Sequence, residues 1–197
     1  IAETGDPALK YVGYGNVSPE WFPCKVLWVK RHEPEAYART HIAFEHTDWL
    51  VYKLSGGEIT RNINTTTVRW FYNSREEGLP TSLYSKIGLE DVFEKVPQRV
   101  VELGEVAGTL SEQMAEETGL QAGIPIAGGG ADAYVGVIGM NALQPGQLAL
   151  ITGSSHLHIG LSEQELHAPG IFGSFPDAIV PGREVVEAGQ ISTRSEE

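Results

Sequence analysis

The stretch IAGGGADAYVGVIGMN, residues 126–141, holds a single carboxylate, Asp132, among glycines and apolar residues. Glycines permit backbone angles closed to other residues and allow a ligand to approach closely. The helix-like run that follows offers free N–H groups, which bind anions. Two interpretations arise: Asp132 caps the helix, or it is a catalytic base at the end of a strand. Spacing alone favours the cap. The stretch matches neither a dinucleotide fingerprint nor a Walker A loop.

A second candidate is the turn in LALITGSSHLHIG, residues 148–160, where Gly153, Ser154 and Ser155 join two expected strands. Small hydroxyl residues in a tight turn can direct N–H and O–H donors at a phosphate. Taken alone, however, the segment favours an ordinary serine-rich hairpin turn. His156 and His158 share one face of the second strand. Because a third ligand is missing nearby, we interpret both as structural and expect no metal site built from them.

Three further side chains are of interest because of their types. Glu187, in VVEAGQIST, stands between apolar residues and a glycine, where a solvated surface charge would be unusual. The alternative is a charge on an edge strand. Trp21 and Arg69 are interpreted as a core indole and a surface cation unless the fold brings them together in one pocket.

The elements that must position these residues begin with helices. Ser18 is a candidate N-cap, and Pro19 at the first helical position predicts a helix that carries Trp21 and Trp28 on one face with Lys25. Pro34 is expected to end that helix and to open the next.

Two more helices have clear end signals. Thr47 is expected to cap a short amphipathic core helix that includes Trp49, Leu50 and Leu54, and Gly56 is expected to stop it. Ser111 is expected to cap a helix that Gly119 terminates. Between them, residues 58–73 alternate β-branched and polar residues, which favours an extended segment or loop with Arg69 near its end.

From residue 120 the pattern becomes strand, glycine turn, helix, strand, strand. GIPIAGGG predicts a short buried strand, ADAYVGVIGMN a helix of small residues, and GQLALITGSSHLHIGL a β-hairpin. The change in composition near residue 120 is the candidate domain boundary, which divides the chain into residues 1–120 and 121–197.

Bulk composition narrows the classes of function. A formal charge of -12 argues against a nucleic-acid or anionic-membrane surface, because neutralising phosphates takes clustered lysine and arginine. The single cysteine of the chain, Cys24, cannot form an internal disulfide, which fits a reducing cytoplasm. We find neither a signal peptide nor an apolar run of the roughly 20 residues that span a bilayer. The absence of an initiator methionine indicates an internal fragment of a longer protein.

Taken together, these segments resemble one family, the FGGY carbohydrate kinases. TDWLVYKLSGGEITRN, the stretch from GTLSEQ to ITGSS, and VVEAGQIST occur in the family's order and at its spacing. Within the family, the segment from YVGYGN to EAYART looks most like pentulose kinases of the ribulokinase type. The resemblance implies an α/β, ribonuclease-H-like (actin-like ATPase) fold. Residues 1–120 would be the later part of the sugar-binding domain, and 121–197 the beginning of the ATP-binding domain.

The resemblance also implies roles for individual residues. Asp132 matches the catalytic aspartate, the general base toward a sugar hydroxyl, and with Trp21, Arg69 and Glu187 it falls where ribulokinases contact the sugar. The turn Gly153, Ser154 and Ser155 matches the turn that contacts ATP phosphates. Arg69 departs from the lysine of the ribulokinase pattern; a planar guanidinium need not make the same contact.

The expected activity is therefore phosphorylation of a ketopentose, such as ribulose or xylulose, or of a related polyol at a primary hydroxyl, with ATP and Mg²⁺ as cofactors. The expected partner is a small sugar, and a homodimer is left open. One rival is a catalytically incomplete remnant that acts as a sugar-binding or interaction module. Another is an actin-like scaffold that hydrolyses ATP without a sugar.

Overall fold

The computed structural model describes residues 1–152 and 155–192; for Tyr14, Ser155 and residues 189–192 the backbone alone is described. The chain mixes helices and short strands, as predicted for an α/β protein. The α-helices are α1 (Phe22–His32), α2 (Pro34–Arg39), α3 (His46–Ser55), α4 (Ile63–Arg69), α5 (Thr81–Lys86), α6 (Glu112–Thr118) and α7 (Asp132–Gly139). Short 3-10 helices are η1 (Ala2–Thr4), η2 (Pro7–Lys10), η3 (Gly13–Gly15) and η4 (Glu90–Glu94).

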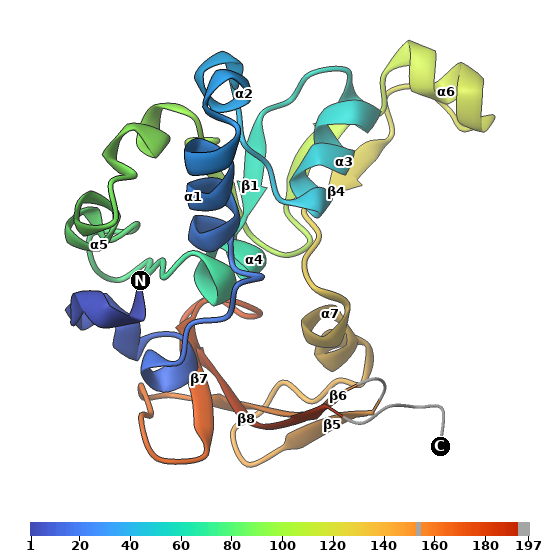
Figure 1. Cartoon of the computed structure of the whole chain (residues 1–197). Helices are drawn as coiled ribbons and strands as arrows, with labels where there is room; N and C mark the ends of the chain where they lie inside the picture. Colours follow the sequence, from blue (N-terminus) through green and yellow to red (C-terminus); the bar gives the residue numbers. More distant parts are fainter. Residues whose placement is uncertain (153–154, 193–197) are drawn as a thin grey trace.

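In the described part of the chain, the strands form three separate sheets. They are β1 (Thr60–Asn62), β2 (Arg99–Val101), β3 (Val106–Thr109), β4 (Pro125–Ala127), β5 (Leu148–Thr152), β6 (Ser155–Ser162), β7 (Ile171–Pro176) and β8 (Glu184–Ser192). β1 and β2 pair in parallel, and β3 pairs with β4 antiparallel. The other four make an antiparallel sheet in the order β5-β6-β8-β7. In Figure 1 this sheet lies at the bottom of the molecule, with α4 and α7 above it.

The first long helix starts later than predicted. α1 begins at Phe22, and Trp21 occupies the N-cap position without a side-chain cap bond. The prediction that Ser18 caps this helix is therefore wrong; its hydroxyl accepts a hydrogen bond from the Glu20 N–H in the loop before the helix. Pro34 opens α2 directly after α1 ends, as predicted.

Helix α3 has the predicted end but not the predicted buried face. Gly56 closes it in the left-handed conformation, with φ 77°. Trp49 and Leu50 are exposed, whereas the buried residues are Val51 and Asp48. The prediction that Trp49 and Leu50 belong to the core is therefore wrong. The helix packs inward through other residues, Asp48 and Val51.

Residues 58–73 are extended only at their start. β1 covers Thr60–Asn62, and α4 follows at once over residues 63–69. Asn62 caps α4, since its side-chain oxygen accepts a hydrogen bond from the Thr65 N–H at 2.8 Å. The β-branched residues that favoured an extended segment are buried in α4, so tertiary burial overrides their local preference.

The second half follows the predicted order of elements. Ser111 caps α6 through the Met114 N–H, and Gly119 ends it with φ 74°. Strand β4, helix α7 and the β5–β6 hairpin lie where the pattern places them. β4 is not buried as predicted, however, because Pro125 and Ala127 are exposed and Ile126 is only partly buried. The domain boundary near residue 120 stays a prediction.

Aromatic residues dominate the main core. Its largest fully buried side chains include Trp70, Tyr84, Phe71 and Phe175. The Trp70 ring stacks on Phe22 of α1, with 3.6 Å between centroids. The core thus ties α1 to the segment that follows α4. Across residues 1–152 and 155–192, no helix is long and apolar enough to cross a membrane.

One buried carboxylate should make stability depend on pH. Asp48 is 2% exposed, and burial raises its pKa from the ordinary 3.8 to about 6, although two hydrogen bonds from Asn62 to Oδ1 oppose the rise. Nearby Glu45 raises this pKa further and Arg61 lowers it. Because the folded state holds this proton more tightly than the unfolded state, the free energy of unfolding should fall as pH rises between these two values.

We therefore expect Asp48→Asn to flatten that part of the pH profile. Asparagine keeps the oxygen that accepts both bonds and removes the charge. Relative to the variant, the natural protein should lose up to about 2–3 kcal/mol between about pH 4 and about pH 7. Denaturant unfolding of both proteins at several pH values measures the difference. Parallel profiles would contradict the assignment.

Candidate active site

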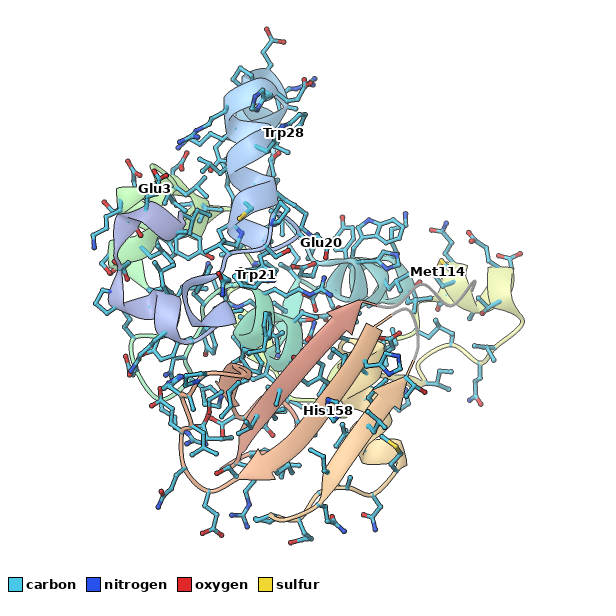
Figure 2. The ribbon with its side chains drawn as sticks, turned by 60° about the horizontal axis from the view of Figure 1, so that its bottom comes forward. Glu3, Glu20, Trp21, Trp28, Met114 and His158 are labelled. Atoms are coloured by element: carbon cyan, nitrogen blue, oxygen red, sulfur yellow. The ribbon has the colours of Figure 1, made fainter. Side chains whose placement is uncertain are left out.

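A cleft of about 420 Å³ brings together four side chains that the sequence singled out: Trp21, Arg69, Asp132 and Glu187. They come from the residue before α1, the end of α4, the start of α7 and the middle of β8. Figure 2 places Trp21 at the base of α1, near the centre of the molecule. Residues far apart in the chain therefore line one cleft. Trp21 and Arg69, a core indole and a surface cation, both lie along it.

Asp132 is the first residue of α7 rather than its cap. The N-cap position belongs to Ala131, which makes no side-chain cap bond. The Asp132 Oδ1 atom accepts a hydrogen bond from the Ala133 N–H at 2.8 Å, and the residue is exposed along the cleft. The interpretation of Asp132 as the helix cap is therefore wrong, because the N-cap position lies one residue earlier. The first turn of α7 orients the carboxylate.

The glycines before Asp132 make room mainly for the protein itself. A Cβ atom on Gly128 would lie 2.7 Å from the Glu102 carbonyl oxygen, and one on Gly130 would lie 2.8 Å from Asn64 Oδ1. Of the three glycines, Gly129 alone could carry a Cβ atom with no other atom within 4 Å. Gly128 and Gly130 are therefore explained by close packing of the strand end against earlier parts of the chain, and less by space for a ligand.

Glu187 lies inside the sheet and is not an edge-strand charge. β8 pairs with β6 on one side and β7 on the other, and Glu187 is 4% exposed. The Tyr134 hydroxyl of α7 donates a hydrogen bond to its Oε2 atom. Burial raises the pKa of Glu187, while this hydrogen bond and the charge of Arg69 act in the opposite direction.

Arg69 supplies a positive charge to the cleft. It is the last residue of α4 and is partly exposed. Its charge lowers the pKa of both Glu187 and Tyr134, against the larger effect of burial on each. The cleft is therefore lined by carboxylates, among them Asp132 and Glu187, together with the Arg69 guanidinium. Such a set can bind hydroxyl groups as donor and acceptor at once.

Trp21 forms an apolar wall that is itself held by aromatic neighbours. Its ring meets Phe71 and Phe172 edge to face, with centroid distances of 5.5 and 6.0 Å. Phe71 adopts φ 60°, a conformation that non-glycine residues rarely take. Gly13 has φ 68°, and a Cβ atom there would lie 2.8 Å from the indole. Gly13 thus leaves room for the indole, and the Phe71 ring packs against it.

The candidate phosphate turn cannot be placed. Gly153 and Ser154 lie outside the described residues, and Ser155 begins β6 with its side chain outside the description. Within the described part of the chain, no group of three or more His, Cys, Asp or Glu residues is arranged to hold a metal ion. The roles given to this turn stay predictions.

Sequence reasoning missed two residues that shape the cleft, Tyr134 and Asn64. Tyr134 is fully within the core and reaches Glu187 across 53 positions of sequence. In the nearby sequence, Tyr134 is marked out only as a bulky aromatic residue in a helix of small residues. The hydrogen-bond partners of Asn64 are more distant still, at 67 and 114 positions along the chain.

The fold agrees with comparisons to known proteins. The model of the FGGY family of carbohydrate kinases, N-terminal domain, matches residues 11–139. An FGGY carbohydrate kinase domain-containing protein of Xenopus laevis is 34% identical over 98% of this chain and 38% of its own length. A ribulokinase of Bacillus licheniformis is 35% identical over 95% of this chain and 34% of its own length.

A solved structure shows the same fold. A xylulose kinase from Rhodospirillum rubrum superposes with a TM-score of 0.79 at 22% identity, over 98% of this chain and 38% of that one. The chain has the actin-like ATPase fold of these sugar kinases, as predicted. It belongs to the FGGY family of carbohydrate kinases. It spans a little over a third of the length of the relatives it matches.

Proposed function

We propose that the protein to which this chain belongs is an ATP-dependent sugar kinase that phosphorylates a primary hydroxyl of a ketopentose, such as ribulose or xylulose, or of a related polyol. The observation that carries the proposal is the meeting of Trp21, Arg69, Asp132 and Glu187 in one cleft. Its volume falls within the range of about 300–1,000 Å³ that small-molecule sites have. Ribulokinases and xylulose kinases among the relatives support the substrate class.

Asp132 is the proposed general base. Its carboxylate would accept the proton of the sugar hydroxyl while that oxygen forms a bond to the γ-phosphorus and the bond from phosphorus to the β,γ-bridging oxygen breaks. ADP leaves with the electron pair of the broken bond. Because phosphoryl transfer depends on positioning and charge stabilisation, a carboxylate oriented by a helix turn is suited to this work.

Trp21, Arg69 and Glu187 are the proposed sugar contacts. The indole face would pack on the carbon skeleton, while Arg69 donates to hydroxyl oxygens and Glu187 accepts from hydroxyl groups. The Tyr134 hydrogen bond occupies one carboxylate oxygen, Oε2. The guanidinium in place of a lysine donates from a planar fork, so its hydroxyl partners would differ from those of a lysine.

The phosphates of ATP would be held by Gly153, Ser154 and Ser155. The donor set fits in kind, because backbone N–H and hydroxyl groups are suited to phosphate oxygens. When bound, ATP supplies the transferred phosphoryl group and Mg²⁺ neutralises its charge. Asp132, the first residue of the helix α7 that packs against β5 and β6, would contribute the proton transfer.

A substrate panel tests the proposal. The complete protein is incubated with MgATP and D-ribulose, L-ribulose, D-xylulose or erythritol, and ADP formation is compared with a sugar-free control. We expect at least one of these acceptors to stimulate ADP release and to yield a sugar phosphate. Turnover independent of sugar would favour an ATPase scaffold. Sugar binding without transfer would favour a binding module, and either result would overturn the kinase proposal.

A further inference from the structure

We infer that Asn64 is a positioning residue that fixes Asp132 relative to the rest of the cleft; the inference rests on the proposed function. Asn64 is the second residue of α4 and is 0% exposed. It lines the cleft, yet both ends of its amide are engaged by the backbone of other segments. Its contribution would therefore come through other residues and not through contact with the substrate.

The acceptor end of the amide holds the start of α7. Asn64 Oδ1 accepts a hydrogen bond from the Ala131 N–H at 2.9 Å. Ala131 is the N-cap residue, and its own side chain offers no cap. Asp132 follows it directly in the chain. A shift of Ala131 would therefore move the carboxylate.

The donor end of the amide holds a second segment. Asn64 Nδ2 donates to the Ala178 carbonyl oxygen at 3.0 Å, in the connection between β7 and β8. Strand β8 carries Glu187, and α4 itself ends in Arg69. One buried amide thus links the elements that carry three of the charged residues of the cleft, Arg69, Asp132 and Glu187.

The packing around the amide leaves little room for adjustment. A Cβ atom on Gly130 would lie 2.8 Å from Asn64 Oδ1, 3.0 Å from Asn64 Cβ and 2.9 Å from a methyl group of Leu103. Glycine at this position therefore lets the chain approach the amide closely enough for the Ala131 hydrogen bond. Asparagine is required as well, because a carboxylate would lose the donor and repel the Ala178 carbonyl.

The test compares Asn64→Leu with Asn73→Leu in the complete protein. Leucine is close to asparagine in size and removes both the acceptor and the donor of the amide. Asn73 is also buried, and its Oδ1 accepts from the Arg75 N–H at 2.9 Å, in a turn that does not line the cleft. We expect Asn64→Leu to lower kcat about 10- to 100-fold, because a displacement of about 1 Å is enough for such a loss. KM for the sugar should change by less than about threefold. Asn73→Leu should leave kcat near that of the natural enzyme.

Hydrogen exchange supplies a readout that does not need activity. In Asn64→Leu, which removes the acceptor of the Ala131 N–H, the amides of residues 130–132 should exchange about tenfold faster or more, while α6 remains unchanged. If Asn64→Leu does not fold, Gly130→Ala should give the same pattern, because its Cβ atom would press on the same amide. Unchanged exchange, or equal loss of kcat in Asn73→Leu, would overturn the inference. If the natural protein phosphorylates no sugar, the proposed function fails and hydrogen exchange alone decides the positioning role.

Discussion

Asp132→Asn is expected to lower the kcat of the complete enzyme by about 10²- to 10⁴-fold, the usual contribution of a general base. Asparagine has nearly the same shape and keeps the oxygen that accepts from the Ala133 N–H, so α7 should remain in place. It cannot take a proton from a sugar hydroxyl. KM for the sugar should change by less than about threefold, because the sugar contacts remain.

The matched control is Asp91→Asn. Asp91 is remote from the cleft, in η4, where it accepts a hydrogen bond from Lys30 at 2.7 Å. Steady-state kinetics of both variants with the best sugar of the panel separate a specific loss from a general effect of charge removal. An Asp132→Asn enzyme with undiminished kcat would remove the general base from the proposed mechanism.

Trp70→Ala is expected to have the largest effect on stability, a loss of about 3–5 kcal/mol in the free energy of unfolding. Trp70 is fully buried and stacks on Phe22. Its Nε1–H donates to Glu45 Oε1 at 3.1 Å, and Glu45 is itself buried. The substitution therefore leaves both a large cavity and a buried carboxylate without that donor.

Trp28→Ala provides the same chemical change at the surface. Trp28 is 55% exposed and stacks on His32, and Figure 2 shows it further along α1 than Trp21. Its loss should reduce the free energy of unfolding by less than about 1 kcal/mol, because little buried area disappears. Denaturant unfolding followed by circular dichroism measures both variants. Similar losses would mean that Trp70 does not anchor the core as described.

Local signals in the sequence were sufficient for several elements. Both ends of α6 could be predicted because Ser111 and Gly119 act on the backbone next to them. The β5–β6 hairpin follows from alternation over a few residues. Where burial by distant elements decides, local signals fail. The segment after Asn62 is the clearest case, since it becomes α4 despite its β-branched residues.

The cleft could be predicted only as a set of family positions. No local pattern relates Trp21 to Glu187, and their meeting depends on how α1, α4, α7 and β8 pack. The hydrogen bonds of Tyr134 and Asn64 join residues 53 or more positions apart, so neither pairing leaves a trace in nearby sequence. The family resemblance identified the candidate residues, whereas their neighbours in the cleft are decided by tertiary packing.

The central claim is that this cleft holds a sugar whose hydroxyl Asp132 deprotonates. Its most direct test is the phosphoryl-transfer step itself, measured in a single turnover by rapid quenching with labelled MgATP and saturating sugar. The natural enzyme should form labelled sugar phosphate about 100-fold faster or more than Asp132→Asn, while calorimetry gives the two proteins similar sugar affinities. Equal transfer rates, or a natural enzyme that forms no sugar phosphate, would contradict the account.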